Sequence, residues 1–151
     1  MKISLVYFHP PNEYETLTVE TSKPLNAYTK LYNVLRDVLE IKRSMFFDRD
    51  IRFDATDNSF FIRCEANKWF GIFNIFLEFI INGSIPKEGK TKVTIKYRAR
   101  LACEIEEKGV LKELLLLFYY NFFIKKQFEE NKKIVKKVVE EIKQKLISIL
   151  S

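Results

Sequence analysis

The C-terminal stretch of the chain, residues 110–151, contains neither Gly nor Pro and constrains the fold more than any other segment. It predicts one long helix, because apolar residues recur in steps of three and four that keep them on one face. This stripe consists of Leu117, Tyr120, Ile124, Phe128, Val135, Val138, Ile142, Leu146 and Ile149, with only Asn131 polar on it. At about 1.5 Å per residue the helix would measure roughly 60 Å, against the ~38 Å expected of a compact domain of this size. We therefore expect it to cross a whole sheet and project beyond it, or to bend.

The first half of this helix carries a second apolar face, well around the helix from the stripe. Its members are Leu111, Leu114, Leu115, Phe118 and Phe122. In water they would form an apolar patch of the kind that marks an interface. We expect the face to be covered by the Met45 to Phe47 region, by the N-terminal strand, or by a second copy of the chain in a homodimer.

Much of the remaining chain alternates with period two, which predicts strands. Residues 1–8 and 13–21 predict two strands, and residues 51–105 predict consecutive hairpins with turns near 57–58, 67–71 and 83–89. In the clearest strand, residues 91–105, one face carries Val93, Ile95, Tyr97, Ala99, Leu101, Cys103 and Ile105. The other face carries Lys92, Thr94, Lys96, Arg98, Arg100 and Glu104. Such alternation indicates an antiparallel sheet with one dry face and one wet face.

A helical segment separates the second strand from the hairpins. Ser22-Lys23-Pro24 supplies a cap and a first-turn proline, and residues 25–39 have helical spacing, with a break expected near Arg36-Asp37. The whole pattern predicts an α+β fold, in which a curved antiparallel sheet wraps around the long C-terminal helix. We expect a single domain, residues 1–151: an N-terminal arm or extra strand (1–12), a strand, helix and hairpin region (13–106), and the long helix (107–151).

Composition narrows the class of protein. Hydrophobic residues make up 47% and aromatics 15%, enough for a large apolar interior or an apolar cavity without disulfides. Two cysteines are too few for a disulfide framework, so we expect a reduced, cytoplasmic setting. Abundant Lys and Glu with two Gln suggests a thermophilic source. The N-terminus does not look like a signal peptide, and the most apolar run, Leu114 to Ile124, is too short for a transmembrane segment.

The net charge of +6 is mixed with acids, which favours solvated surfaces over a nucleic-acid site. Lys92, Lys96, Arg98 and Arg100 share the outer face of one predicted strand, whereas that strand's aromatic residue points to the other side. Stacking on bases is therefore not expected, and we predict no nucleic-acid partner.

Residues for covalent or metal chemistry are scarce. The only histidine, His9, stands beside two prolines, so a catalytic triad or dyad lacks its base. No metal-ligand spacing and no cofactor motif occurs, and we expect neither metal nor cofactor. Tyr97 and Tyr120 are inward-facing groups that would either bond a ligand carbonyl or sit in the core with their hydroxyls reaching water or backbone.

The order of elements resembles the START-like, helix-grip superfamily, also called SRPBCC, which includes birch pollen allergen, polyketide cyclases and lipid-transfer domains. The resemblance rests on Thr18 to Val34 as first strand and helix entry, on GKTKVTIKYRARL (Gly89 to Leu101) as a late strand, and on the terminal helix. It covers about residues 13–150, whereas residues 1–12 lack a counterpart and the helix is longer than usual. The resemblance implies a deep cavity between sheet and helix that takes a hydrophobic small molecule or lipid.

The leading hypothesis is therefore non-catalytic binding or transport of such a ligand. The expected cavity lining is Phe60, Ile62, Phe73, Ile75, Leu77, Phe79, Val93, Ile95, Tyr97, Leu117, Tyr120 and Ile124. One alternative is an interaction or dimerisation module whose interior is filled by side chains. Another is a polyketide cyclase-like enzyme, which requires a carboxylate projecting into the cavity.

Overall fold

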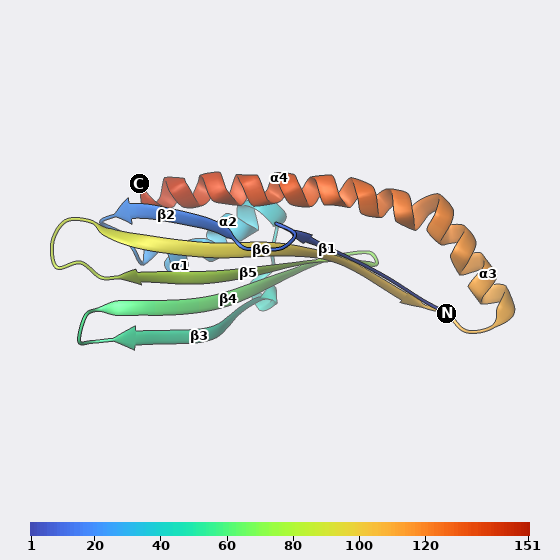
Figure 1. The fold of residues 1–151 in the computed structure, drawn as a ribbon, viewed down its shortest axis with the longest axis horizontal. Helices are drawn as coiled ribbons and strands as arrows, with labels where there is room; N and C mark the ends of the chain where they lie inside the picture. Colours follow the sequence, from blue (N-terminus) through green and yellow to red (C-terminus); the bar gives the residue numbers. More distant parts are fainter.

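An antiparallel six-stranded sheet forms one layer of the protein, and helices cover one of its faces (Figure 1). The computed structural model describes residues 1–151. The strands are β1 (Lys2–His9), β2 (Glu15–Thr21), β3 (Phe46–Asp54), β4 (Ser59–Phe70), β5 (Phe73–Ser84) and β6 (Thr91–Glu106). The helices are α1 (Asn26–Thr29), α2 (Leu31–Leu39), α3 (Val110–Tyr119) and α4 (Lys125–Leu150). The predicted α+β class, with a curved antiparallel sheet and a long C-terminal helix, is confirmed.

β6 is the strand around which the sheet is built. The strand order is β1-β6-β5-β4-β3, and β2 also pairs with β6. β1 takes the C-terminal half of β6, from Lys2 opposite Glu106 to His9 opposite Ala99. β2 takes the N-terminal half, from Glu15 opposite Tyr97 to Thr21 opposite Thr91. β1 and β2 therefore lie end to end along one edge of β6, so residues 2–9 are a sheet strand.

The alternation in β6 is seen in the structure as expected. Its inward residues Val93, Ile95 and Tyr97 are buried, whereas Lys92 and Lys96 are exposed on the other face. The β4–β5 hairpin is tighter than predicted: β4 continues to Phe70, which pairs with Phe73 across Gly71 and Ile72. Gly71 has a positive φ of 61°, which its missing side chain allows, so the turn falls there and not over residues 67–71.

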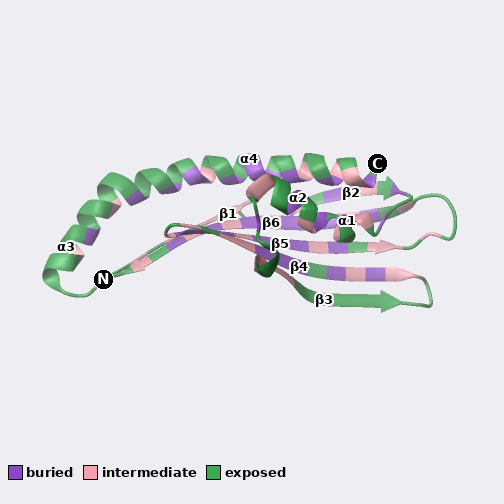
Figure 2. Cartoon of the chain, turned by 180° about the vertical axis from the view of Figure 1, so that it is seen from behind, coloured by how far each residue is buried: buried purple, intermediate pink, exposed green.

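The period-two pattern of β3 does not produce a buried face. Ile51 and Phe53 are more than half exposed, because β3 is the edge strand farthest from α4 (Figure 2). Alternation showed that one face of this strand is apolar, but no element covers it.

The early helical segment is interrupted at Lys30, not at Arg36-Asp37. Lys30 separates the single turn of α1 from α2, and α2 runs through Arg36 and Asp37 to Leu39. Those two charged side chains are half exposed and lie 3.5 Å apart, so they are solvated on the outer side of a continuous helix. Leu31 and Leu35 of α2 are fully buried, and α2 packs against α4.

The C-terminal helix bends, which is one of the two outcomes expected from its length. A π-helical turn (Tyr120–Ile124) joins α3 to α4, and α3 curves away beyond the end of the sheet (Figure 1). α4 lies along β1, β2 and β6 and beside α1 and α2. The C-terminal helix leaves the surface of the sheet at the π turn.

The π turn also shifts the buried face of the helix by one residue. From Ile124 to Leu146 the predicted stripe faces the sheet, with Val135, Ile142 and Leu146 fully buried. Before the turn the prediction is wrong: Leu117 is 42% exposed, and its neighbour Leu116 is buried instead. A π turn holds an extra residue, so the spacing that works for one α-helix loses its phase there.

Candidate functional site

Most of the predicted cavity lining belongs to the packed core. Phe60, Ile62, Phe73, Ile75, Leu77, Phe79, Val93, Ile95, Tyr97 and Ile124 are all buried in one hydrophobic cluster. The rings of Phe79 and Tyr97 stack with centroids 5.9 Å apart. Tyr120 is half-buried at the π turn, and Leu117 lies outside. Of this set, Phe73 and Ile124 alone line either of the two apolar cavities described next.

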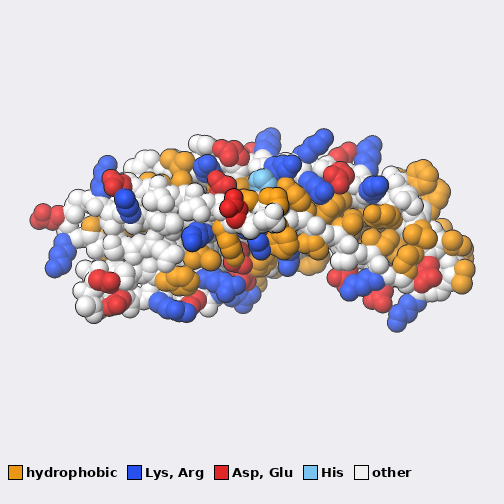
Figure 3. Space-filling view, viewed as in Figure 1, with side chains coloured by type: hydrophobic (Ala, Val, Ile, Leu, Met, Phe, Trp, Pro, Cys, Tyr) orange, Lys and Arg blue, Asp and Glu red, His pale blue; other side chains and the backbone are white.

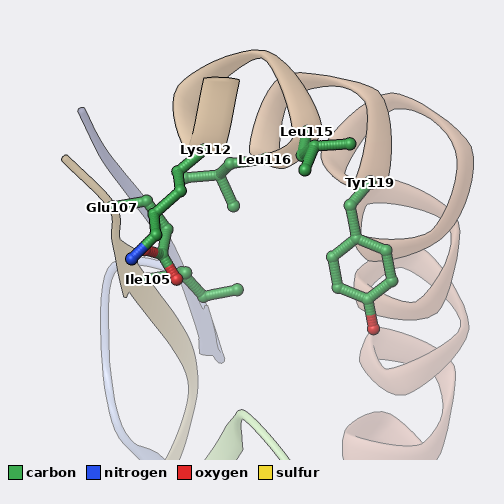
Figure 4. Close-up of a pocket in the computed structure, with 6 residues that line it drawn as sticks. All are labelled: Ile105, Glu107, Lys112, Leu115, Leu116 and Tyr119. Atoms are coloured by element: carbon green, nitrogen blue, oxygen red, sulfur yellow. The ribbon is translucent and has the colours of Figure 1, made fainter. Parts of the chain in front are cut away.

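The first cavity lies between α3 and the C-terminal end of β6. Its volume is about 380 Å³, and it is partly open to solvent. In Figure 4, Ile105 and Leu116 point into the space between strand and helix, and Tyr119 hangs from α3 on the other side. Glu107 and Lys112 bring opposite charges to the strand side of the same space. The lining is thus apolar with one charged margin.

The second cavity lies under the π turn, against the β4–β5 hairpin. Its volume is about 320 Å³, and it shares Tyr119 with the first cavity. Its other lining residues are Phe70, Gly71, Ile72, Phe73, Phe123, Ile124, Gln127 and Asn131. Gln127 and Asn131 supply the only side-chain amides in this lining. α4 therefore presents two residues to this cavity: Gln127 and Asn131, the polar residue on the predicted stripe.

Sequence reasoning missed most of these lining residues. Leu116 was missed because the π turn moves it, rather than Leu117, to the inner side. Phe70 was assigned to a turn and Ile72 was given no role, whereas both flank the Gly71 bend and line this cavity with apolar side chains. The aromatic cluster of residues 118–123 was the available signal, because so many rings around one helical turn exceed what a single buried stripe needs.

The two tyrosines predicted to face a ligand lie in different places. Tyr97 is near Glu15 of β2 and Glu140 of α4. Glu140 lies twenty residues after Tyr120 on the C-terminal helix, so roughly 30 Å of helix separates the two tyrosines. The Tyr97 hydroxyl is buried and has no hydrogen-bond partner. Burial raises the pKa of Tyr97, with the Glu15 and Glu140 carboxylates adding to the effect. This hydroxyl is a neutral core group distant from both cavities.

The predicted interface residues are exposed. Leu111, Leu114, Leu115, Phe118 and Phe122 are each at least 60% accessible. Neither of the two segments of the same chain that we expected to cover them does so, since Phe46 packs on Tyr32 and β1 pairs with β6. The face is therefore bare in this structure, and the predicted helix phase is wrong before the π turn, where Leu116 and not Leu117 is buried.

The outer face of the sheet combines basic and aromatic side chains, contrary to the expectation that its aromatics point elsewhere. The rings come from β1, from β5 and from the loop before β2 rather than from β6. The Arg98 guanidinium lies 4.2 Å from the centre of the Phe8 ring and 5.2 Å from that of Tyr14. Arg100 lies over Phe76 at 4.9 Å. Because arginines already cover these rings, the faces that a base would stack on are occupied within the chain.

Reactive groups elsewhere are held in unreactive forms. Burial raises the pKa of the Cys64 thiol to about 12, with Asp48 and Glu65 adding to it, and burial also raises the pKa of Cys103. Burial, together with the charge of Lys136, lowers the pKa of His9, so its imidazole favours the neutral form. His9 Nδ1 lies 3.2 Å from the Tyr7 hydroxyl. These three residues line neither cavity.

Comparison with known proteins finds similar solved structures but no family. No family model and no curated protein sequence matches the chain. Similar solved structures include a protein of unknown function from Staphylococcus aureus, with 12% identity, a TM-score of 0.29, and coverage of 91% of this chain and 95% of the other. An 18 kDa protein from Caulobacter crescentus has 12% identity, a TM-score of 0.22, and coverage of 90% and 97%. A putative uncharacterized protein from Rhizobium leguminosarum has 11% identity, a TM-score of 0.20, and coverage of 95% and 97%. At these scores the likenesses carry no argument about function.

Proposed function

We propose that the protein binds a hydrophobic small molecule or lipid at the α3 end of the sheet, without covalent chemistry of its own. The observation that carries the proposal is the pair of largely apolar cavities, about 380 and 320 Å³, that share Tyr119. Each falls at the lower end of the size range of small-molecule sites, and a longer ligand would occupy both.

The polar groups at the two ends of this site favour a ligand that is apolar in the middle. Gln127 and Asn131 offer amide donors and acceptors in the second cavity, and Glu107 and Lys112 offer charges in the first. Tyr119 stands between these ends, so its ring would contact the apolar part of the ligand. The resemblance of the element order to the helix-grip superfamily supports the same ligand class.

The cyclase alternative has one observation in its favour. Glu107 is the only carboxylate in either lining, and the alternative requires such a group. Glu107 shares the margin of the first cavity with Lys112, and neither lining holds a histidine or a second carboxylate. We therefore propose no reaction, and homodimerisation through the exposed α3 face stays a prediction.

Native mass spectrometry of the purified protein tests the proposal directly. A co-purifying lipid-like mass is expected on the monomer, and organic extraction should release it. Leu116→Trp, which would fill the first cavity with an indole, should reduce the bound fraction at least tenfold. Leu117→Trp is the matched control, because the neighbouring Leu117 is 42% exposed and lies outside both linings.

A second cavity variant keeps the proposal testable if Leu116→Trp does not fold. Ile105→Trp enters the same cavity from the sheet side, and circular dichroism verifies that each variant is folded. A folded wild-type protein that carries no ligand and takes up no fluorescent fatty acid would refute the proposal. An empty dimer in the same spectrum would favour the interaction module.

A further inference from the structure

α3 is amphipathic in the reverse sense to an ordinary surface helix. At about 100° per residue, Leu117, Val110, Leu114, Phe118, Leu111 and Leu115 fill an arc of roughly 160° on the side away from Leu116. All of these side chains are exposed, whereas Leu116 is buried. The charged residues Lys112 and Glu113 lie on the side nearer the sheet, where Lys112 lines a cavity and Glu113 meets the Met1 amine at 2.7 Å. The water-facing side of this helix is thus entirely apolar.

The apolar arc continues across the π turn. Phe118 and Phe122 pack against each other with ring centroids 4.5 Å apart, and Tyr119 and Phe123 do so at 5.4 Å. We call the exposed set the α3 apolar surface; it consists of Val110, Leu111, Leu114, Leu115, Leu117, Phe118, Phe122 and Phe123, between 42% and 78% exposed. At about 100 Å² for each side chain it exposes on the order of 800 Å², more than the largest apolar patch of a typical monomer.

Lysines stand at both ends of this surface. Lys108 and Lys112 lie at its start, and Lys125 and Lys126 follow within three residues of its last aromatic ring. None of these four lysines has an acidic partner within 4 Å, although Lys112 shares its cavity margin with Glu107. Long lysine side chains beside an apolar face reach the level of anionic lipid headgroups.

The position of the surface suits a broad, flat partner. In Figure 3 hydrophobic side chains gather over the end of the molecule formed by α3, at one extreme of its long axis. No other element of the chain stands beyond that end to obstruct a planar approach (Figure 1).

The width of the arc favours a bilayer over a second copy. A helix that packs against a protein surface needs an apolar stripe of about 100°, so a helix pair would leave part of the 160° arc in water. A bilayer interface accepts the whole arc, places aromatic rings at the headgroup boundary, and attracts the flanking lysines. We propose that α3 and the π turn dock the protein on the surface of a membrane that contains anionic lipid, with the helix lying in the interface.

Vesicle flotation tests this inference. Wild-type protein should float with vesicles in which a third of the lipid is phosphatidylglycerol, and much less with vesicles of phosphatidylcholine alone. The double variant Leu114→Asp, Phe118→Asp should lose binding at least tenfold. Ile134→Asp is its control, because Ile134 is exposed on α4 outside the α3 apolar surface. Lys125→Glu with Lys126→Glu should also weaken binding at least tenfold, whereas Lys137→Glu with Lys145→Glu, of equal net charge, should have little effect.

A fluorescent reporter measures insertion without relying on loss of function. The only tryptophan, Trp69, lies on β4, so the variant Trp69→Phe, Phe122→Trp moves the indole to the α3 apolar surface. Its emission should shift to shorter wavelength on addition of the phosphatidylglycerol vesicles. A reporter that does not shift, together with a wild-type monomer that does not float, overturns the inference. A dimer that Leu114→Asp, Phe118→Asp dissociates, without vesicle binding, overturns it in favour of a second copy.

The docking inference does not depend on the proposed ligand site. Leu114 and Phe118 line neither cavity, so their variant should keep a cavity ligand and lose vesicles. Leu116→Trp should lose the cavity ligand and keep vesicle binding. Failure of the proposed ligand site and failure of the docking inference are therefore distinguishable.

Discussion

Two isoleucines on α4 provide a matched test of how this helix is held. Ile142 is fully buried against the sheet, whereas Ile134, about two turns earlier on the same helix, is 48% exposed. Truncation of either to Ala removes the same three carbons and changes helix propensity by the same few tenths of a kcal/mol. The difference between the two variants therefore isolates burial.

The expected magnitudes are well separated. Three buried carbons at about 0.8 kcal/mol each give about 2.4 kcal/mol of lost transfer free energy for Ile142→Ala. The cavity left in a packed core raises the total to about 3–4 kcal/mol. Ile134→Ala should cost less than about 1 kcal/mol, because its side chain is half in water already.

Urea unfolding followed by circular dichroism measures both variants. With a slope of about 2 kcal/mol per molar, Ile142→Ala should lower the unfolding midpoint by about 1.5–2 M, and Ile134→Ala by under 0.5 M. Equal midpoints for the two variants, or a loss below about 1 kcal/mol at Ile142, would refute the assignment of the α4 stripe to the core.

Three further predictions follow from individual residues. Leu116→Ala should destabilise the protein by about 2 kcal/mol and Leu117→Ala by clearly less, because only Leu116 is buried; thermal unfolding of the pair decides whether the π turn sets the phase. Tyr97→Phe should leave stability at neutral pH unchanged or raise it by about 1 kcal/mol, since the buried hydroxyl has no partner. The pKa of Tyr97 is higher in the folded than in the unfolded protein, so the protonated hydroxyl contributes its full stability below the unfolded pKa of about 10 and loses it as the pH rises further. The urea midpoint of Tyr97→Phe should therefore fall less steeply at alkaline pH than that of the wild-type protein. Parallel curves for the two proteins would contradict this. Cys64 and Cys103 are buried with raised pKa values, so a thiol reagent at neutral pH should modify the native protein slowly and both thiols rapidly in urea; fast labelling of the native protein would show that the strands open readily.

One finding concerns membranes more broadly: none of the helices is both long enough and apolar enough to cross a bilayer. The docking inference concerns a helix that lies in the interface, which depends on exposed side chains along one arc rather than on a long apolar span.

Local periodicity predicted the class of fold and the buried sides of its longest elements. The alternation of residues 91–105 identified β6 and its buried side, and the steps of three and four from Ile124 to Leu146 identified the sheet-facing side of α4. Both patterns come from the geometry of a single element, 2.0 residues per repeat in a strand and 3.6 in a helix, so they can be read without knowing the neighbours.

Tertiary structure decided what covers each apolar face. Ile51 and Phe53 alternate as a core strand would, yet β3 lies at the sheet edge and leaves them in water. The π turn moved Leu116 inward and Leu117 outward, which the spacing of a regular α-helix does not reveal. The residues predicted to line a cavity are mostly packed in the core, and the two cavities lie at the bend between α3 and α4 instead. A hydrophobic pattern shows which side chains avoid water, but it does not show whether another side chain, a ligand or a membrane replaces the water.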